Sequence, residues 1–442
     1  MFKIIYKKGS ISMYTKLPDF NHMISFISEY AKVANERGAD PSVIIGEVEA
    51  ALNIALDVLR VLPASADNLM RQPSGYNDIL SLRPEGPRRL WKTFDEKVYA
   101  DKIKGALLGR MAGCTLGAPV EFWEIERMEN WAAHIGDEFP NKDYWSAIPE
   151  PYNIRYMIGK CGSYTRGGMD GVPVDDDVVY TILGLLIAEE YGVDFTTADV
   201  GAAWIKYLPM ACTAEDIALR AIKSGVPAEQ AAEADNPYLH WIGADIRADP
   251  IGYMAPGCPE IAARMAYRDA YLSHRQNGIY GSMYFAAVIA AAFAADNAMD
   301  ALRTGLAEIP RDCDLYRDIM WALKAGQGIH DYKAARAAVE ERFSGMSGVH
   351  TNNNACLTVF GLMIGDGDFS KSISETVAMG LDNDCTAATV GSIAGAIAGG
   401  DGIPTHWTMS FNNIIHTYFY GYPDFRIDDL LERFTVQARK CF

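Results

Sequence analysis

Two segments, residues 279–296 and 385–399, are apolar or small on every side, and they constrain the fold more than any other feature of the chain. Helices without a polar face are stable only when other helices surround them. Strand-like alternation is almost absent, whereas apolar residues recur at helical spacing in many further segments. The sequence predicts an all-α fold, with helices at about 97–117, 177–191, 197–207, 258–275, 279–296, 298–307, 330–343, 353–365, 369–380, 385–399 and 428–440.

The N-terminal region has a different organisation. Two helical patterns, about 22–37 and 41–61, predict a helical hairpin. The segment 63–89 is rich in Pro, Ser, Gly and Asn and has no periodicity, which is typical of a linker or a surface strap. We therefore expect an N-terminal helical extension with its linker over residues 1–95, and an all-α main domain over 96–442.

Charge and cysteine usage restrict the partners and the compartment. The 40 Lys and Arg residues against 57 Asp and Glu residues leave a formal charge of −17, which repels nucleic acid and anionic membranes. The eight cysteines are scattered singly, which fits a reducing compartment. Residues 1–16 are basic, but their apolar stretches are too short for a signal peptide, and no apolar run reaches the roughly 20 residues that span a bilayer. We expect a cytoplasmic protein, with its oligomeric state left open.

Three consecutive carboxylates, Asp175, Asp176 and Asp177, precede a strongly apolar helical segment. A helix N-terminus favours acidic side chains by about 0.3–1 kcal/mol each. Capping explains one or two of these acids, and the mutual repulsion of three is costly unless a cation neutralises it. Helix capping and metal binding both stay open as interpretations of this run by itself.

A second acidic run, Asp382 and Asp384, precedes a buried helix with Gly or Ala on nearly every face. Such a helix can pack backbone to backbone against its neighbours and hold a site rigidly. By itself, the run is equally consistent with an Asp-rich turn before a packing helix. Two acidic helix N-termini in one helical chain indicate one shared site. Oxygen ligands without His or Cys select a hard cation, so Mg²⁺ is favoured, with Mn²⁺ as the alternative.

Four motifs together resemble the ADP-ribosylglycohydrolase family over about residues 97–410. The segment from Lys104 to Glu121 is similar to the family pattern G-x-x-x-G-D-x-x-G-x-P-x-E. The two acidic runs stand where the family has T-D-D-T and D-x-D-T. The segment Asn277-Gly-Ile-Tyr-Gly-Ser-Met283 resembles the Gly-rich, Met-containing loop beside the phosphates. Each motif alone is weak, but their combination and order are specific.

The resemblance implies one all-α domain, a compact orthogonal multi-helix bundle, with a binuclear Mg²⁺ centre between the two acidic runs. Asp176 and Asp177 fall on the first pair of Asp ligands of the family, and Asp382 and Asp384 fall on the later pair. The implied activity is hydrolysis of the bond between the ribose of ADP-ribose and an acceptor. The acceptor belongs to an ADP-ribosylated protein or small molecule.

Two departures from the family pattern bear on the metal ligands. Asp175 adds a charge where the family has a hydroxyl, and Cys385 occupies the position of the final ligand Thr. A neutral thiol is a poor Mg²⁺ ligand. Thr386 or a water is therefore expected to take its place, or the second ion binds weakly. The expected ligands are Asp175, Asp176, Asp177, Asp382, Asp384 and Thr386.

Catalytic roles follow from the same resemblance. Metal ions at such a site bind ribose hydroxyls and lower the pKa of water. Asp176 and Asp384 are the candidates to accept a proton from that water. Glu121 matches a family glutamate that assists the site, and a solvated position at a helix end is its alternative interpretation.

Substrate contacts are expected at the Gly-rich motif and at one polar turn. The N-terminal amides of a helix that begins near Gly281, Ser282 and Met283 suit a diphosphate. Asn277 and Tyr280 are expected to line the same pocket, although a Tyr before an apolar helix is more often structural. A second polar cluster includes His350 and Asn353. Helix capping is the main interpretation of this cluster, and contact of His350 and Asn353 with the substrate is the alternative.

Two further functions remain open. The same metal centre could hydrolyse another N- or O-riboside or a nucleotide sugar, because of the departures at Asp175 and Cys385. The chain could also be a non-catalytic protein that keeps the fold, as in lens crystallins that resemble this family. The five retained acids argue against that, because a structural protein gains nothing from their mutual repulsion.

Overall fold

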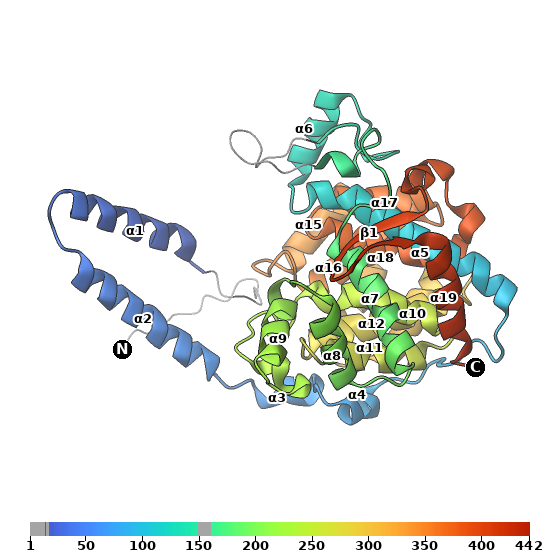
Figure 1. Cartoon of the computed structure of the whole chain (residues 1–442), viewed down its shortest axis with the longest axis horizontal. Helices are drawn as coiled ribbons and strands as arrows, with labels where there is room; N and C mark the ends of the chain where they lie inside the picture. Colours follow the sequence, from blue (N-terminus) through green and yellow to red (C-terminus); the bar gives the residue numbers. More distant parts are fainter. Residues whose placement is uncertain (1–13, 15–16, 149–160) are drawn as a thin grey trace. The chain divides into compact units, whose positions relative to one another are not determined.

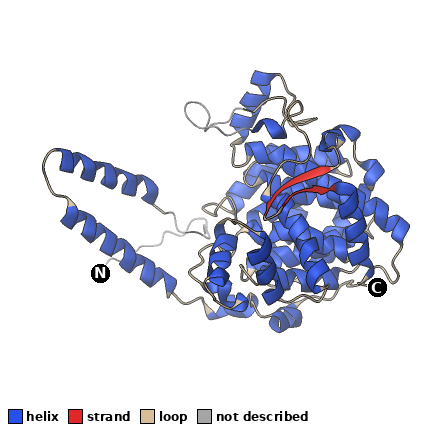
Figure 2. Ribbon diagram, in the orientation of Figure 1, coloured by secondary structure: helices blue, strands red, loops and turns tan. Residues whose placement is uncertain are grey.

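The structure is a computed structural model that describes residues 14, 17–148 and 161–442. Nearly all of its regular structure is helical (Figure 2), which confirms the predicted all-α fold. One antiparallel pair of strands is added, β1 (Ile414–Phe419) and β2 (Tyr422–Arg426). Within the described residues, no helix is long and apolar enough to cross a membrane. The basic segment 1–16 lies outside the described residues apart from Tyr14.

Contacts within the chain divide it into two compact units. The larger consists of Arg71–Arg342 and Ser347–Phe442, and the smaller of the residues before Arg71 with Phe343–Met346. In the smaller unit, α1 (Phe20–Glu36) and α2 (Ser42–Arg60) form at the two predicted helical segments, and neither has a buried residue. Apart from Phe343, every buried side chain among the described residues belongs to the larger unit. An enclosed site is therefore a feature of the larger unit.

The segment after the hairpin, which we expected to be a linker or strap, contains two short helices, α3 (Ala66–Arg71) and α4 (Tyr76–Leu82). From Arg71 onward this segment is part of the larger unit, in which the amide of Gln72 donates a hydrogen bond to the carboxylate of Asp314 at 2.9 Å. The two compact units divide between Met70 and Arg71.

The larger unit is a bundle of helices that pack in several directions (Figure 1). Besides α4, four of its helices have no counterpart among the predicted segments: α6, α9 and α14, which each bury only one face, and α10, which is buried at every residue. The helices are α5 (Glu96–Gly117), α6 (Ile125–Ile135), α7 (Asp176–Tyr191), α8 (Thr197–Tyr207), α9 (Thr213–Lys223), α10 (Ala248–Met254), α11 (Pro259–Ala270), α12 (Asn277–Ala292), α13 (Ala298–Gly305), α14 (Asp314–Ala325), α15 (Tyr332–Arg342), α16 (Thr351–Gly365), α17 (Phe369–Ala378), α18 (Asn383–Ala398) and α19 (Ile427–Arg439).

The helices α5 and α18 run in opposite directions and touch through their backbones. A side-chain carbon at Gly109 would lie 2.2 Å from the carbonyl oxygen of Gly391, and one at Gly113 would lie 2.0 Å from that of Ala387. Only glycine allows so close an approach. This contact confirms the predicted backbone packing of the small-residue helix. It also brings the first turn of α18 beside the last turn of α5.

Two further helices are enclosed by their neighbours. Every residue of α12 is buried, and so is every residue of α16 except Met363. The continuous apolar pattern of residues 279–296 therefore corresponds to a helix inside the core, as predicted. This core forms a rigid base for the acidic helix N-termini.

Candidate active site

The first acidic run begins α7, and its three carboxylates have different surroundings. Asp175 is the N-cap residue, and its carboxylate accepts a hydrogen bond from the N–H of Asp177 at 3.0 Å. Asp176 and Asp177 are the first two residues of the helix, and both line a cavity. Capping thus accounts for one acid of the three.

The second acidic run occupies the turn before α18. Asp382 is the N-cap residue, yet its side chain makes no capping hydrogen bond, and Asp384 lies in the first turn. Both are buried, and the Oδ1 atom of Asp384 has no hydrogen-bond partner among the described residues. Burying a carboxylate oxygen without a partner is costly, and a ligand that binds this oxygen would offset the cost.

Backbone contacts hold the ends of these elements together. A side-chain carbon at Gly117, the last residue of α5, would lie 2.5 Å from the Cα of Asp384. The N–H of Phe122 donates a hydrogen bond to the carbonyl of Leu381 at 3.0 Å. Glu121, which precedes Phe122, is thereby fixed beside the turn that carries the second acidic run.

The two runs meet in space and form two groups of carboxylates. In the first group, one oxygen each from Asp175, Asp177 and Asp384 lie within 4.8 Å of one another. In the second group, one oxygen each from Glu121, Asp382 and Asp384 lie equally close. Asp384 belongs to both groups, so the two groups form a single site.

A buried arginine on α5 stands behind this site. Arg110 is fully buried, and its Nη2 donates to the Oδ1 of Asp177 at 3.0 Å. Its Nη1 lies 2.8 Å from the Oδ2 of Asp249, and its Nε donates to the hydroxyl of Thr181 at 2.6 Å. The cation orients Asp177 and offsets part of its charge. Sequence reasoning overlooked this residue, which falls on a variable position of the quoted family pattern.

Burial and mutual repulsion raise the pKa values of these carboxyls above their ordinary range. Burial, followed by the neighbouring Asp384, raises the pKa of Glu121 to about 9. Burial also raises the pKa of Asp384 to about 6, and nearby Asp176 adds to the rise. The pKa values of Asp175, Asp177 and Asp382 are raised well above the ordinary range, mainly by burial. A bound cation would act in the opposite direction, because it favours the charged form of each acid.

The acids open into a cavity of about 350 Å³. Its walls come from Glu121, the first turn of α7, the start of α9, the turn before α18, and a segment that includes Trp241 and the 3₁₀ helix η5 (Ile242–Arg247). Among the described residues, its lining includes no Lys, Arg or His. The cavity thus combines a strongly acidic wall with an aromatic one.

The sequence pattern of the ADP-ribosylglycohydrolase family matches residues 95–439. The chain belongs to this family. One solved structure, described as an ADP-ribosylglycohydrolase-related protein complex, matches 78% of this chain and 99% of its own, with 19% sequence identity and a TM-score of 0.48. No curated protein matches the chain. Membership of the family makes the chain a glycohydrolase-type hydrolase.

The motif expected beside the phosphates in this glycohydrolase lies inside the core. The side chains of Asn277, Tyr280, Ser282 and Met283 are buried, and none lines the cavity. A side-chain carbon at Gly281 would lie 2.2 Å from a carboxylate oxygen of a neighbouring residue. The Gly and small residues therefore serve close helix packing in α12, and the structure does not bring this motif to the acidic site.

The polar turn before α16 also has internal partners. The Nδ1 atom of His350 accepts a hydrogen bond from the N–H of Asn352 at 3.1 Å, which is the capping interpretation of this residue. The amide of Asn353 donates to the carbonyl of Ser347 at 2.8 Å. Neither His350 nor Asn353 lines the cavity, although the adjacent Val349 does.

The last expected metal ligand, Thr386, points elsewhere. Its hydroxyl donates a hydrogen bond to the carbonyl of Asp382 at 3.0 Å, and it does not line the cavity. Cys385 does line the cavity. The position of the family's final ligand thus faces the acids, and in this glycohydrolase a buried thiol occupies it.

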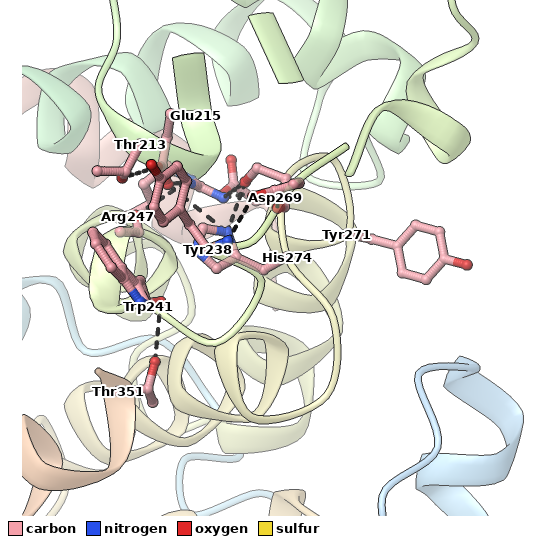
Figure 3. Close-up of polar contacts among 12 residues, drawn as sticks. Thr213, Glu215, Tyr238, Trp241, Arg247, Asp269, Tyr271, His274 and Thr351 are labelled. Carbon is pink, nitrogen blue, oxygen red and sulfur yellow. Dashed lines mark hydrogen bonds and ion pairs between the residues drawn. The ribbon is translucent and has the colours of Figure 1, made fainter. Parts of the chain in front are cut away.

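Several cavity residues of this glycohydrolase were absent from the sequence-based candidates. Thr213 and Glu215 come from the start of α9, and Trp241 comes from the segment before η5. Figure 3 shows Glu215 in a network of polar contacts with Arg247 and Asp269. Acids in the first turn of an amphipathic helix, here Glu215 and Asp216, are an ordinary surface pattern, so the sequence carried no signal for Glu215.

Proposed function

We propose that this family member is a metal-dependent hydrolase that cleaves the bond between ribose and an acceptor, with ADP-ribosylated proteins or small molecules as substrates. The observation that supports the proposal is the pair of carboxylate groups that share Asp384 at the wall of one cavity. Family membership supports the reaction class.

The donor set fits Mg²⁺, or Mn²⁺ as the alternative. Asp175, Asp177 and Asp384 would hold one ion, and Glu121, Asp382 and Asp384 would hold the other. All of these donors are carboxylate oxygens, which hard cations prefer. As a ligand of both ions, Asp384 could bind one of them through its Oδ1 atom, which has no hydrogen-bond partner among the described residues. When bound, ions of this kind polarise water and the ribose hydroxyls.

Asp176 is the carboxylate that we assign to proton transfer. It lines the cavity and lies outside both carboxylate groups. As the oxygen of water bonds to the anomeric carbon, Asp176 accepts the proton that the water loses. The acceptor leaves with the electron pair of the broken bond and takes up a proton. Ile242 and Ile246 contribute apolar side chains to the lining of the same cavity.

The test is turnover of ADP-ribosylated arginine and serine peptides, with Mg²⁺ or with a chelator. We expect ADP-ribose release only with the metal. Asp176→Asn should lower kcat by about 10²–10⁴-fold, the usual contribution of a general base, with little change in KM. The control is Asp57→Asn, which changes an exposed acid on α2. Turnover in the chelator, or full activity of Asp176→Asn, would contradict the proposal.

A second candidate substrate, an uncharged riboside, is favoured by the charge of the cavity. Six carboxylates line the cavity, and no cationic side chain of the described residues lines it to receive a diphosphate. Free nucleosides in the same assay separate the two candidates. Faster turnover of nucleosides than of ADP-ribosylated peptides would replace the first candidate with the second. No turnover of either would favour the non-catalytic alternative.

A further inference from the structure

Glu215 is a carboxylate of the cavity that takes no part in either carboxylate group. It lies in the first turn of α9, it is buried, and it lines the same cavity as Asp176 and Asp384. A side chain in this place contacts whatever the cavity holds. It needs a role separate from that of the clustered acids.

Contacts with Arg247 and Gly243 fix the position of the Glu215 carboxylate. Its Oε1 pairs with the Nη1 of Arg247, whose Nε pairs with Asp269 (Figure 3). A side-chain carbon at Gly243 would lie 2.4 Å from the same oxygen, so the glycine leaves room for the carboxylate. Since Arg247 is shared between two acids, its single charge does not neutralise both. Glu215 is thus fixed in place and remains a strong hydrogen-bond acceptor.

The second oxygen of Glu215 is available. The hydroxyl of Thr213 is the donor assigned to Oε2, at 3.5 Å, which is the far limit of a hydrogen bond. A short bond to a ligand would be stronger than this one. The backbone of Thr213, with a φ of 45°, lies in the left-handed region that favours glycine. Holding the turn in this conformation costs free energy, and the turn delivers Thr213 and Glu215 to the cavity.

The other cavity groups restrict the chemistry of the ligand. Trp241 is half-buried and offers an aromatic surface in the same cavity. The charged side chains of the lining are all acids. A negatively charged ligand group beside Glu215 would therefore be repelled. A flat group with N–H donors satisfies both walls: its face packs on the indole and its edge donates to the carboxylate.

We propose that Glu215 is a specificity-determining residue that accepts a hydrogen bond from a planar N–H group on the substrate, with Trp241 packing against that group. The inference rests on the proposed function, since it assigns Glu215 to the part of the substrate that leaves the ribose. Two leaving groups share this chemistry, the amide edge of a nucleobase and the guanidinium of an arginine.

The test measures binding of the leaving group alone to the full chain in Mg²⁺, by titration calorimetry. The probes are hypoxanthine for the nucleobase and N-methylguanidine for arginine, with nitrobenzene as an uncharged planar probe that has no hydrogen-bond donor. We expect the wild type to bind one of the two N–H probes. Glu215→Gln should weaken that binding by about tenfold or more, the effect of losing one hydrogen bond to a charged group. The matched control, Glu190→Gln, removes an exposed acid that pairs with Lys206, and should change nothing.

Trp241→Ala is the second variant, because it leaves the Glu215–Arg247 pair intact. It should weaken binding of both the N–H probe and nitrobenzene, whereas Glu215→Gln should leave nitrobenzene binding unchanged. Tighter binding of hypoxanthine assigns the subsite to a base, and tighter binding of N-methylguanidine assigns it to arginine. Binding of neither by the wild type, or equal binding by Glu215→Gln, overturns the proposal. Probe binding by a wild type that hydrolyses no substrate would instead indicate failure of the proposed function and leave the subsite assignment standing.

Discussion

At the scale of single residues, the site is governed by carboxyls that are buried close together. Asp384 belongs to both carboxylate groups, and Glu121 belongs to one. Burial and neighbouring acids raise the pKa of Asp384 to about 6 and that of Glu121 to about 9. The folded chain without metal therefore binds protons that the unfolded chain releases near its ordinary carboxyl pKa values.

This difference sets the direction of the pH dependence. Raised carboxyl pKa values contribute stability that is present below about pH 4, the ordinary range, and is lost as pH rises through about 6 for Asp384 and about 9 for Glu121. The melting temperature of the metal-free protein should therefore decrease as the pH rises from about 4 to about 9. The stabilisation by Mg²⁺, which needs ionised ligands, should grow over the same range.

Scanning calorimetry at several pH values, with Mg²⁺ or with a chelator, measures both trends. Asp384→Asn is the control, because it removes one of the titrating groups and should flatten the metal-free slope. A metal-free melting temperature that rises with pH across this range would contradict the account.

At the scale of elements, the position of the acids depends on the contact between α5 and α18. Gly117 packs against the backbone of Asp384, so Gly117→Ala should displace that residue. We expect Mg²⁺ affinity to fall by about 10–100-fold, as for other residues that orient metal ligands. The free energy of unfolding should fall by about 1–3 kcal/mol from overpacking.

Gly46→Ala is the matched control for this variant. Gly46 lies inside α2 with open space around its Cα, so the added methyl meets nothing. It should leave Mg²⁺ affinity unchanged and raise helix stability by roughly 0.5–1 kcal/mol. Calorimetric Mg²⁺ titration and urea unfolding measure both effects. Wild-type Mg²⁺ affinity in Gly117→Ala would show that the glycine contact does not position Asp384.

The elements also show what the sequence could predict. The periodicity of α7 and the small residues of α18 identified both acidic helix N-termini, since these patterns depend on local structure. The Gly-rich motif at Asn277–Met283 resembled a binding loop, but its glycines serve packing inside α12. Glu215 escaped prediction because it reaches the cavity through tertiary contacts with Arg247 and Gly243, which no local pattern encodes.

At the scale of the whole molecule, charge favours the binding of cations. The chain has a formal charge of −17, and the cavity concentrates acids without a cationic side chain among its described lining residues. Such a field attracts divalent cations and repels polyanions. It is consistent with a metal centre, and it makes bound metal the source of positive charge for any phosphate-bearing substrate.

The central claim is that the two carboxylate groups hold two divalent ions through the shared Asp384. The most direct measurement is a calorimetric titration of Mg²⁺ into metal-free protein, for the wild type, Asp384→Ala and Asp175→Asn. Asp175 belongs to one group only. The account predicts two ions in the wild type, weakening of one in Asp175→Asn, and loss of both in Asp384→Ala. An absence of binding at millimolar Mg²⁺ in the wild type, or unchanged binding in Asp384→Ala, would contradict it.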